Sequence, residues 1–327
     1  MWKKIVGYTL AAVVAVVGSG FAYLYFREPA SRPASTIRVP MTPERIARGK
    51  YIFTASDCDG CHSLHDHSKL YEPVVESKRG AGQVMDEAGL PGRVVAPNIT
   101  PDSDTGLGRW SDGEKLRAIR EGIGRDGRAL FPMMPYQLFR YMSDEDAESL
   151  IAYLNSLAPL RNQLPRSELK FPVSMLIKGE PRPVLQPIAT PSRANTIAYG
   201  EYLVTVGVCE GCHTPFEKGS FDVSKRLAGG RVFKAGEFEV VSANLTPDPD
   251  TGIGNWTLDT FLERFHRHRG VPAEALPPVN KEQWTLMPWR NLAQLSDEDL
   301  SAMYAYLRSR APVTNKVVTH PQAVAQR

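Results

Sequence analysis

The sequence contains CDGCH at residues 58–62 and CEGCH at residues 209–213, and these two pentapeptides use all 4 cysteines of the chain. Each has the form Cys-x-x-Cys-His, which is typical of covalent haem attachment. Two thiols at this spacing can add to the two vinyl groups of one haem, and the histidine that follows is held under the iron as its proximal ligand. The motifs therefore predict two covalently attached haems c.

The residues expected to attach haem are Cys58, Cys61, Cys209 and Cys212, and the expected proximal ligands are His62 and His213. A zinc site is disfavoured, because its two cysteine pairs usually lie about 12–20 residues apart and residues 62–208 separate these. A thioredoxin-like redox pair would occur once and would not need a histidine after its second cysteine. The spacing favours haem over both alternatives.

The N-terminus has the pattern of a membrane anchor. Lys3 and Lys4 precede an uncharged, mainly apolar stretch at residues 5–26, which Arg27 ends. As a helix rising about 1.5 Å per residue, this stretch would extend about 33 Å, enough to cross a hydrocarbon core. A cleaved secretory signal is the alternative, but its apolar region is typically about 7–15 residues long. We expect residues 1–30 to form an uncleaved anchor.

The two lysines predict which side of the membrane the chain occupies. By the positive-inside rule they keep the N-terminus cytoplasmic, so the remainder lies outside. We therefore expect a single-pass protein of the bacterial inner membrane with its haem domains in the periplasm. The rest of the composition is globular, with 42% hydrophobic residues and a net charge of +3. Because no run is strongly basic, the sequence predicts no nucleic-acid binding.

Residues 47–158 and 198–311 repeat the same landmarks in the same order. The paired blocks are ARGKY (47–51) and AYGEY (198–202), NITPD (98–102) and NLTPD (244–248), DTGLGRW (104–110) and DTGIGNW (250–256), MPY (134–136) and MPW (287–289), and SDED (143–146 and 296–299). Such an internal duplication predicts two tandem domains, at residues 40–158 and 194–312. A proline-rich linker at 159–193 joins them, and a tail at 313–327 follows.

Each copy has the pattern of a few helices around one haem. An amphipathic helix is expected to run from Thr42, or from Ala194, to the cysteines. The SDED blocks combine an N-cap serine with acids in the first helical turn, which the helix dipole favours. Gly49 and Gly200 would let the first helix cross the last one closely. We expect an all-α protein of two cytochrome c-like domains, with the linker packed against them because it contains several apolar residues.

The sixth ligand of each iron decides its chemistry, and the duplication selects two candidates. Met134 and Met287 occupy the same position in the two copies, whereas Met133 aligns with a leucine. Methionine at this position favours electron transfer over reaction with small ligands. The alternative is that both methionines are adaptable core residues. Trp110 and Trp256 also recur, either as core aromatics or as hydrogen-bond donors to haem propionates.

Of the five histidines outside the motifs, four lie near other features of interest. His65 and His67 have no counterpart in the second copy and are expected on a surface loop. His266 and His268 lie among arginines and are expected on a basic, solvated helix face, with docking of an acidic partner as the alternative.

The chain resembles the cytochrome c subunits of bacterial membrane-bound dehydrogenases that act on alcohol, gluconate or sorbitol. The resemblance rests on the NITPD, DTGLGRW and MPY blocks, on their second copies, and on YGEYL (199–203) and CHTP (212–215) around the second haem motif. It covers nearly everything past residue 40. The best-known members of this family carry three haem motifs, whereas this sequence carries two. The resemblance implies that the methionines of the Met-Pro-aromatic blocks are distal ligands.

These features predict a dihaem c-type cytochrome that is an electron carrier and not an enzyme. Its expected partners are a periplasmic dehydrogenase subunit and a respiratory acceptor, which is an oxidase, a quinone or a soluble cytochrome. Two alternatives stay open. A dihaem cytochrome c peroxidase would need one iron without a strong distal ligand. The cytochrome c subunit of a haem–copper oxidase also combines an anchor with haem, but its haem domains are usually more compact.

Overall fold

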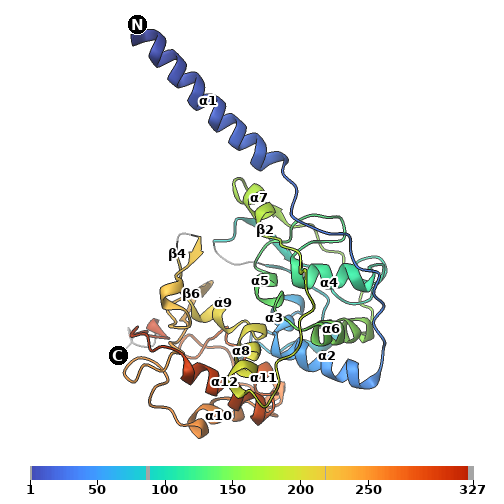
Figure 1. The fold of residues 1–327 in the computed structure, drawn as a ribbon. Helices are drawn as coiled ribbons and strands as arrows, with labels where there is room; N and C mark the ends of the chain where they lie inside the picture. Colours follow the sequence, from blue (N-terminus) through green and yellow to red (C-terminus); the bar gives the residue numbers. More distant parts are fainter. Residues whose placement is uncertain (1, 86–88, 218, 323–327) are drawn as a thin grey trace.

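The computed structural model describes residues 2–85, 89–217 and 219–322. Part of the expected tail, residues 323–327, lies outside the described residues. One long helix, α1, projects from a body formed by the two halves of the repeat (Figure 1). The α-helices are α1 (Trp2–Phe26), α2 (Pro43–Ala55), α3 (Cys58–His62), α4 (Asp112–Glu121), α5 (Tyr136–Phe139), α6 (Asp144–Ser156), α7 (Val173–Leu176), α8 (Thr196–Val206), α9 (Cys209–His213), α10 (Leu258–His266), α11 (Trp289–Leu292) and α12 (Asp297–Ser309).

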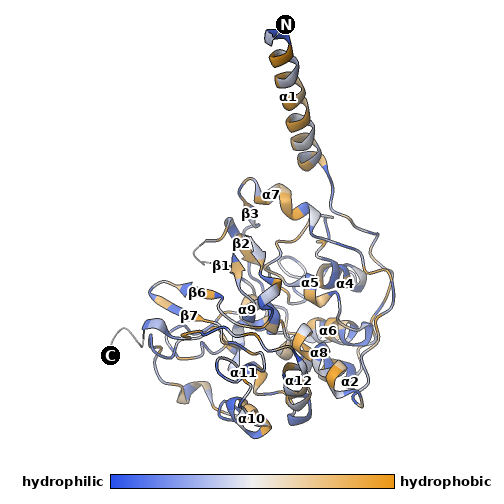
Figure 2. Cartoon of the chain, turned by 60° about the vertical axis from the view of Figure 1, so that its left-hand side comes forward, coloured by the Kyte–Doolittle hydropathy of each residue, from blue (hydrophilic) through white to orange (hydrophobic). Residues whose placement is uncertain are grey.

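Helix α1 matches the predicted anchor. Its 25 residues rise about 37 Å at 1.5 Å each. None of its residues is buried, and most are apolar, as the colouring in Figure 2 shows; its mean hydropathy reaches 2.0. Length and composition suffice for crossing a membrane, although a secretory signal near the N-terminus would have the same properties.

Helices α2 and α6 form the core of the first half, and glycine determines how closely they cross. Thr42 caps α2 by accepting from the Arg45 amide, and Ser143 caps α6 by accepting from the Asp146 amide. At the crossing, a side chain on Gly49 would overlap the backbone carbonyl of Ser149. The two helices bury apolar residues from both sides of this contact, among them Ile52, Phe53, Leu150 and Ile151.

Helices α8 and α12 repeat this arrangement in the second half. Asn195 caps α8 and Ser296 caps α12, the latter by accepting from the Asp299 amide. A side chain on Gly200 would overlap the carbonyl of Ala302, just as one on Gly49 would overlap that of Ser149. The close crossings predicted from the two glycines are therefore present in both halves.

The structure contains three small antiparallel sheets, so the prediction of an all-α fold is wrong in this respect. The strands are β1 (Gln83–Met85), β2 (Gly92–Ala96), β3 (Glu168–Leu169), β4 (Phe216–Glu217), β5 (Ser220–Phe221), β6 (Val232–Ala235) and β7 (Phe238–Val241). They pair as β1-β2-β3, β4-β5 and β6-β7. No strand was predicted for any of these segments. Their Val and Phe residues favour strands, and Gly236, at φ 56°, supplies the left-handed residue of the β6–β7 turn.

The linker packs on the first half, as predicted. Its strand β3 joins β2, with Gly92 opposite Leu169. Further along, the Ile188 carbonyl accepts from the Asp144 amide at 2.8 Å, and the Val184 amide donates to the Glu121 carboxylate at 3.0 Å. The linker is therefore part of the folded body.

The two halves meet through equivalent helices, since α2 contacts α11 and α8 contacts α5. The ends of α2 and α8 also come together, because a side chain on Gly207 would lie 3.5 Å from the Ala55 carbonyl oxygen. Each of these helices ends directly before one Cys-x-x-Cys-His motif. The fold therefore brings the starts of the two motifs to the contact between the halves.

Candidate haem sites

Each motif forms one short helix that begins after a left-handed residue. Asp57, at φ 50°, precedes α3, and Val208, at φ 58°, precedes α9. A left-handed conformation is costly for a side chain such as valine, so its recurrence marks a constrained turn. In both halves the carbonyl of this residue accepts from the third residue of the motif helix, Gly60 at 3.1 Å or Gly211 at 3.0 Å. The turn separates the motif helix from the long helix before it.

The two motif histidines are buried and held in the same way. The Nδ1 atom of His62 lies 2.8 Å from the Pro97 carbonyl oxygen, and that of His213 lies 2.7 Å from the Ala243 carbonyl oxygen. Because a carbonyl only accepts, Nδ1 carries the proton and Nε2 keeps its lone pair. Burial lowers the pKa of both imidazoles below the usual value. Both rings are therefore held as neutral bases with Nε2 able to bind a metal, the arrangement typical of metal-ligating histidines.

A rigid loop holds the carbonyl that orients His62. Asn98 directly follows Pro97, and its Oδ1 accepts from the Thr100 amide at 2.9 Å and the Thr100 hydroxyl at 2.7 Å. Its Nδ2 donates to the Leu160 carbonyl at 2.6 Å. All hydrogen-bonding groups of this buried amide are thus directed at the loop itself or at the chain after α6.

The second half repeats this loop around Asn244, which follows Ala243. Its Oδ1 accepts from the Thr246 amide at 2.9 Å and the Thr246 hydroxyl at 2.8 Å, and its Nδ2 donates to the Val313 carbonyl at 2.8 Å. The NITPD and NLTPD blocks recur in the sequence, but their recurrence alone indicates no role for them. The structure shows one, because the residue before each block accepts from the motif histidine.

Both motifs also carry an acid that pairs with an arginine from the loop beyond. Asp59 is buried, accepts from the Ser63 hydroxyl at 2.6 Å and pairs with Arg79. In the second motif, Glu210 pairs with Arg226. These pairs link each motif helix to the chain that follows it.

Met134 and Met287 occupy equivalent loops. Each is half-buried against the core and is followed by a proline that precedes a short helix, α5 or α11. The carbonyl of Met134 accepts from the Tyr136 amide at 2.8 Å, and that of Met287 accepts from the Trp289 amide at 2.7 Å. Their backbone geometry is shared, and their ligation of iron stays a prediction.

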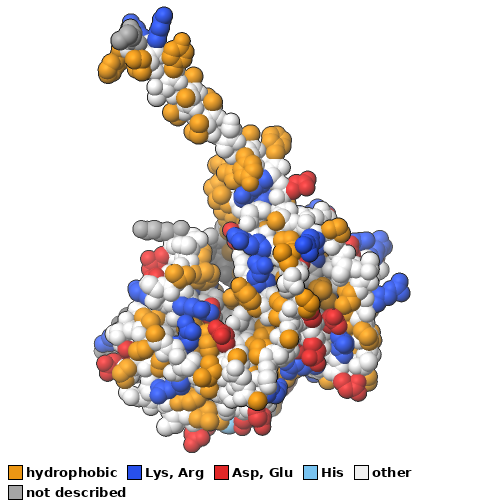
Figure 3. Space-filling model, viewed as in Figure 1, with side chains coloured by type: hydrophobic (Ala, Val, Ile, Leu, Met, Phe, Trp, Pro, Cys, Tyr) orange, Lys and Arg blue, Asp and Glu red, His pale blue; other side chains and the backbone are white. Residues whose placement is uncertain are grey.

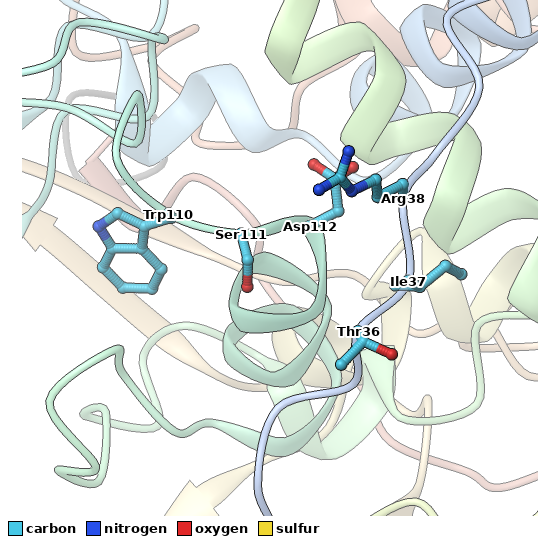
Figure 4. A pocket seen from close by; sticks show the side chains of 6 residues that line it. All are labelled: Thr36, Ile37, Arg38, Trp110, Ser111 and Asp112. Atoms are coloured by element: carbon cyan, nitrogen blue, oxygen red, sulfur yellow. The ribbon is translucent and has the colours of Figure 1, made fainter.

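The two predicted tryptophans differ in their surroundings. Trp256 packs against the core, with the guanidinium of Arg264 4.8 Å from its ring centroid. Trp110 borders a surface hollow between residues 36–38 and the start of α4, and its indole lies apart from Arg38 and Asp112 (Figure 4). Donation from either indole to a haem propionate stays a prediction.

The histidines outside the motifs divide into surface and packed residues. His67 is 68% exposed and pairs with Glu72 at 2.9 Å, as a surface loop predicts. His65 is not a free surface residue as predicted. Its two ring nitrogens lie 2.6 Å from the carbonyl oxygen of Glu72 and 3.0 Å from the carbonyl oxygen of Asp59. It therefore ties the loop to the first motif helix.

The predicted solvated face at His266 and His268 also needs correction. His266 contacts Asp297 at 2.9 Å, and α10 ends there. His268 lies between Tyr71 and Trp289, with ring centroids 4.8 and 5.3 Å away. Burial lowers the pKa of His268 to about 4, so it is neutral near pH 7. It is a packed aromatic between the halves and not a solvated cation.

One loop that was not predicted joins the region of the first haem motif to the second half. The Trp284 indole donates to the Glu72 carboxylate at 2.9 Å. The Leu70 amide donates to the Pro277 carbonyl at 2.9 Å, and the Val279 amide donates to the Ser68 carbonyl at 2.9 Å. No counterpart of this contact exists in the repeat pattern, so the duplication gave no signal for it.

Residues 46–158 match the family model described as cytochrome c. The chain is 33% identical over 297 residues to a component of the nicotinate dehydrogenase of Pseudomonas putida, covering 83% of this chain and 22% of that protein. It is 30% identical over 282 residues to the cytochrome c subunit of the quinone alcohol dehydrogenase of Gluconobacter oxydans, covering 82% of this chain and 55% of that subunit.

A diheme cytochrome c-type protein of Cereibacter sphaeroides is 28% identical over 312 residues, covering 91% of this chain and 96% of that protein. The chain thus spans nearly all of this relative, but only about a fifth and about half of the two dehydrogenase proteins. Residues 46–158 are a cytochrome c domain, and 82% of the chain is similar to part of the cytochrome c subunit of a bacterial quinone alcohol dehydrogenase.

Proposed function

We propose that this chain is a membrane-anchored dihaem c-type cytochrome that carries electrons from a periplasmic dehydrogenase to a respiratory acceptor. The observation that carries the proposal is the repeated setting of the two motif histidines, each with Nδ1 on a backbone carbonyl and Nε2 left to bind a metal. A chain with one functional haem site would not need this loop twice.

The residues present fit covalent haem. Each motif supplies two thiols on one short helix and one neutral imidazole, which are the donors that haem c requires. When bound, haem supplies reversible one-electron chemistry. The protein's part is to hold His62 and His213 in one tautomer and orientation through Pro97 and Ala243, so that each ligand is already in place in both oxidation states.

We further propose that Met134 and Met287 provide the distal ligands. Support comes from their equivalent positions, their shared backbone geometry and their place at the half-buried edge of the core. Thioether ligation raises the reduction potential and closes the position that peroxide would need. This is the feature that distinguishes a carrier from a dihaem peroxidase.

The dehydrogenase partner is supported by two of the relatives, whose names describe parts of dehydrogenases. Membrane attachment is supported by α1, which is long and apolar enough to span a bilayer. With Lys3 and Lys4 on the cytoplasmic side, the body would lie in the periplasm, where a periplasmic dehydrogenase can reach it.

Optical spectroscopy of the purified holoprotein tests the carrier proposal against the peroxidase. A carrier with two histidine–methionine haems shows low-spin spectra in both oxidation states, binds cyanide slowly and reduces peroxide poorly. A high-spin haem together with rapid peroxide turnover would instead identify the protein as a dihaem peroxidase.

A further inference from the structure

The linker touches the end of the anchor helix. The guanidinium of Arg27 donates to the Leu176 carbonyl at 2.9 Å and to the Met175 carbonyl at 3.3 Å. The ammonium of Lys178 donates to the Tyr25 carbonyl at 2.7 Å. These bonds satisfy backbone carbonyls at the C-terminal ends of both α1 and α7. They fix the short helix α7 beside the point where the anchor leaves the body (Figure 1).

An aromatic contact places the linker at the depth of the membrane interface. The ring of Phe171 lies 6.2 Å from that of Phe21, centroid to centroid. Phe21 lies about 7.5 Å along the helix axis before Phe26, where α1 ends. If the helix, about 37 Å long, is centred on a hydrocarbon core of about 30 Å, Phe21 lies about 4 Å inside the core edge. Phe171 then lies at the boundary between acyl chains and headgroups.

The segment at residues 171–177 has the composition of a surface that meets lipid. Phe171 is 66% exposed and Leu176 is 48% exposed, so their apolar surface is not used inside the body. Basic residues flank the segment at Lys170 and Lys178, with the acidic Glu180 just beyond. Apolar side chains that enter the interface beside cations that remain in the headgroups are typical of a membrane-surface contact.

We propose that residues 171–177 insert at the outer boundary between acyl chains and headgroups of the membrane that α1 spans, as a second contact that fixes the orientation of the haem domains. The inference rests on the proposed anchoring by α1. Lipid is the occupant because the exposed apolar surface is continuous with that of α1, and Figure 3 shows hydrophobic side chains running from the helix onto the adjoining part of the body. A segment that touches the spanning helix at this depth meets the bilayer before it meets another protein.

Photolabelling by lipid tests the proposal on the full-length holoprotein. The protein is reconstituted into phosphatidylcholine vesicles that contain a phospholipid with a diazirine on its acyl chain, irradiated, and mapped by peptide mass spectrometry. We expect adducts on α1 and on residues 171–177. The control is Leu258, an exposed apolar residue at the start of α10, which lies at the end of the body away from α1 (Figures 1 and 2). Its peptide should stay unlabelled.

Substitutions of the exposed apolar residues test whether these side chains make the contact with lipid. Replacing Phe171 and Leu176 together by serine should lower labelling of residues 171–177 at least fivefold and leave labelling of α1 unchanged. Leu258→Ser should change neither. The haem absorption spectrum and the haem content of each variant report whether it has folded. If the double variant does not fold and incorporate haem, the labelling pattern of the parent protein alone still tests the proposal.

The outcomes separate this inference from the anchoring proposal. Labelled α1 with unlabelled residues 171–177 would overturn the second contact and leave the anchor intact. A chain that retains α1 but shows no label in either segment would overturn both proposals.

Discussion

The hydroxyl of Tyr51 in α2 donates to the Asp299 carboxylate in α12 at 2.6 Å, which joins the first half of the chain to the second. Tyr202 in α8 makes the reverse contact, donating to Asp146 in α6 at 2.5 Å. The two tyrosines are equivalent in the repeat, and so are the two aspartates. The halves therefore meet as two copies meet in a symmetric dimer, where each contact occurs twice.

This reciprocal contact explains how the interface is kept stable. Asp146 and Asp299 are each 1% exposed, and each also accepts from an arginine, Arg48 at 2.6 Å or Arg193 at 2.6 Å. A buried carboxylate stays charged only when it is well hydrogen bonded. The burial that stabilises the pairs also raises the pKa of the Tyr51 and Tyr202 hydroxyls above the usual value. Both remain donors throughout the neutral range.

Removing either tyrosine hydroxyl should destabilise the protein. Tyr51→Phe and Tyr202→Phe each leave a buried carboxylate short of one donor, which we expect to lower the free energy of unfolding by about 1–3 kcal/mol. Denaturation in urea, followed through the haem absorbance, measures the change. Tyr141→Phe is the control, because Tyr141 is 57% exposed, and its effect should stay within about 0.5 kcal/mol. Equal stability of all three variants would contradict a role for these contacts.

The loop behind each proximal histidine can be tested one half at a time. Asn98→Asp keeps an acceptor for Thr100 but removes the donor to the Leu160 carbonyl, so we expect a loss of about 1–3 kcal/mol and a changed spectrum for the first haem alone. Asn255→Asp is the matched control, because that amide is exposed where it bonds the Pro249 carbonyl. Spectral changes in both haems, or in neither, would show that the loop does not position His62.

The distal ligands can be separated from core methionines by substitution. Met287→Ala should open one iron, lower its reduction potential and allow imidazole to bind there, while the other haem keeps its spectrum. Met133→Ala is the control and should leave both irons six-coordinate. If Met287→Ala retains the parent spectrum and binds no imidazole, Met287 is a packing residue.

We expect the stability of the folded protein to depend on pH through Asp57, the acid that precedes the first motif. Burial raises the pKa of Asp57 to about 7, against the opposing hydrogen bond from Asn291 at 2.7 Å. The unfolded value is near 3.9, so the folded protein holds the proton more tightly. The resulting stabilisation is complete below about pH 4 and is lost as the pH rises through about 7.

Urea denaturation at several pH values between 5 and 8 tests this dependence. Between pH 5 and pH 8 the parent should lose about 2–3 kcal/mol more stability than Asp57→Asn, which carries no titrating proton at this position. Other groups, including haem propionates, titrate equally in both proteins, so the difference between them reports Asp57. Parallel curves for the two would contradict a raised pKa at this position.

Local features of the sequence were the most predictable part of the fold. Ser143 and Ser296 cap helices, and Gly49 and Gly200 lie at close crossings, because capping and steric clearance depend on the residue itself. The repeat then indicated which residues are equivalent, and the structure gives those residues equivalent contacts.

Features that depend on distant partners were not predictable. Pairing of β3 with β2 joins the linker to a segment far from it in sequence, so the local pattern of the linker indicated only a proline-rich connection. His268 was expected in solvent because arginines flank it, yet Tyr71 from the other half covers its ring. The carbonyl groups of Pro97 and Ala243 carry no sequence signal of their own, and only the repeated blocks that follow them mark their position.

An electron carrier of this kind holds two haems in one chain, each of which cycles between oxidised and reduced low-spin states. Reductive titration of the purified full-length protein, with haem quantified as its pyridine haemochrome, tests this most directly. We expect two covalent haems per chain and uptake of two electrons, with both haems low-spin before and after reduction. One haem per chain, or a second haem that stays high-spin and turns over peroxide, would contradict it.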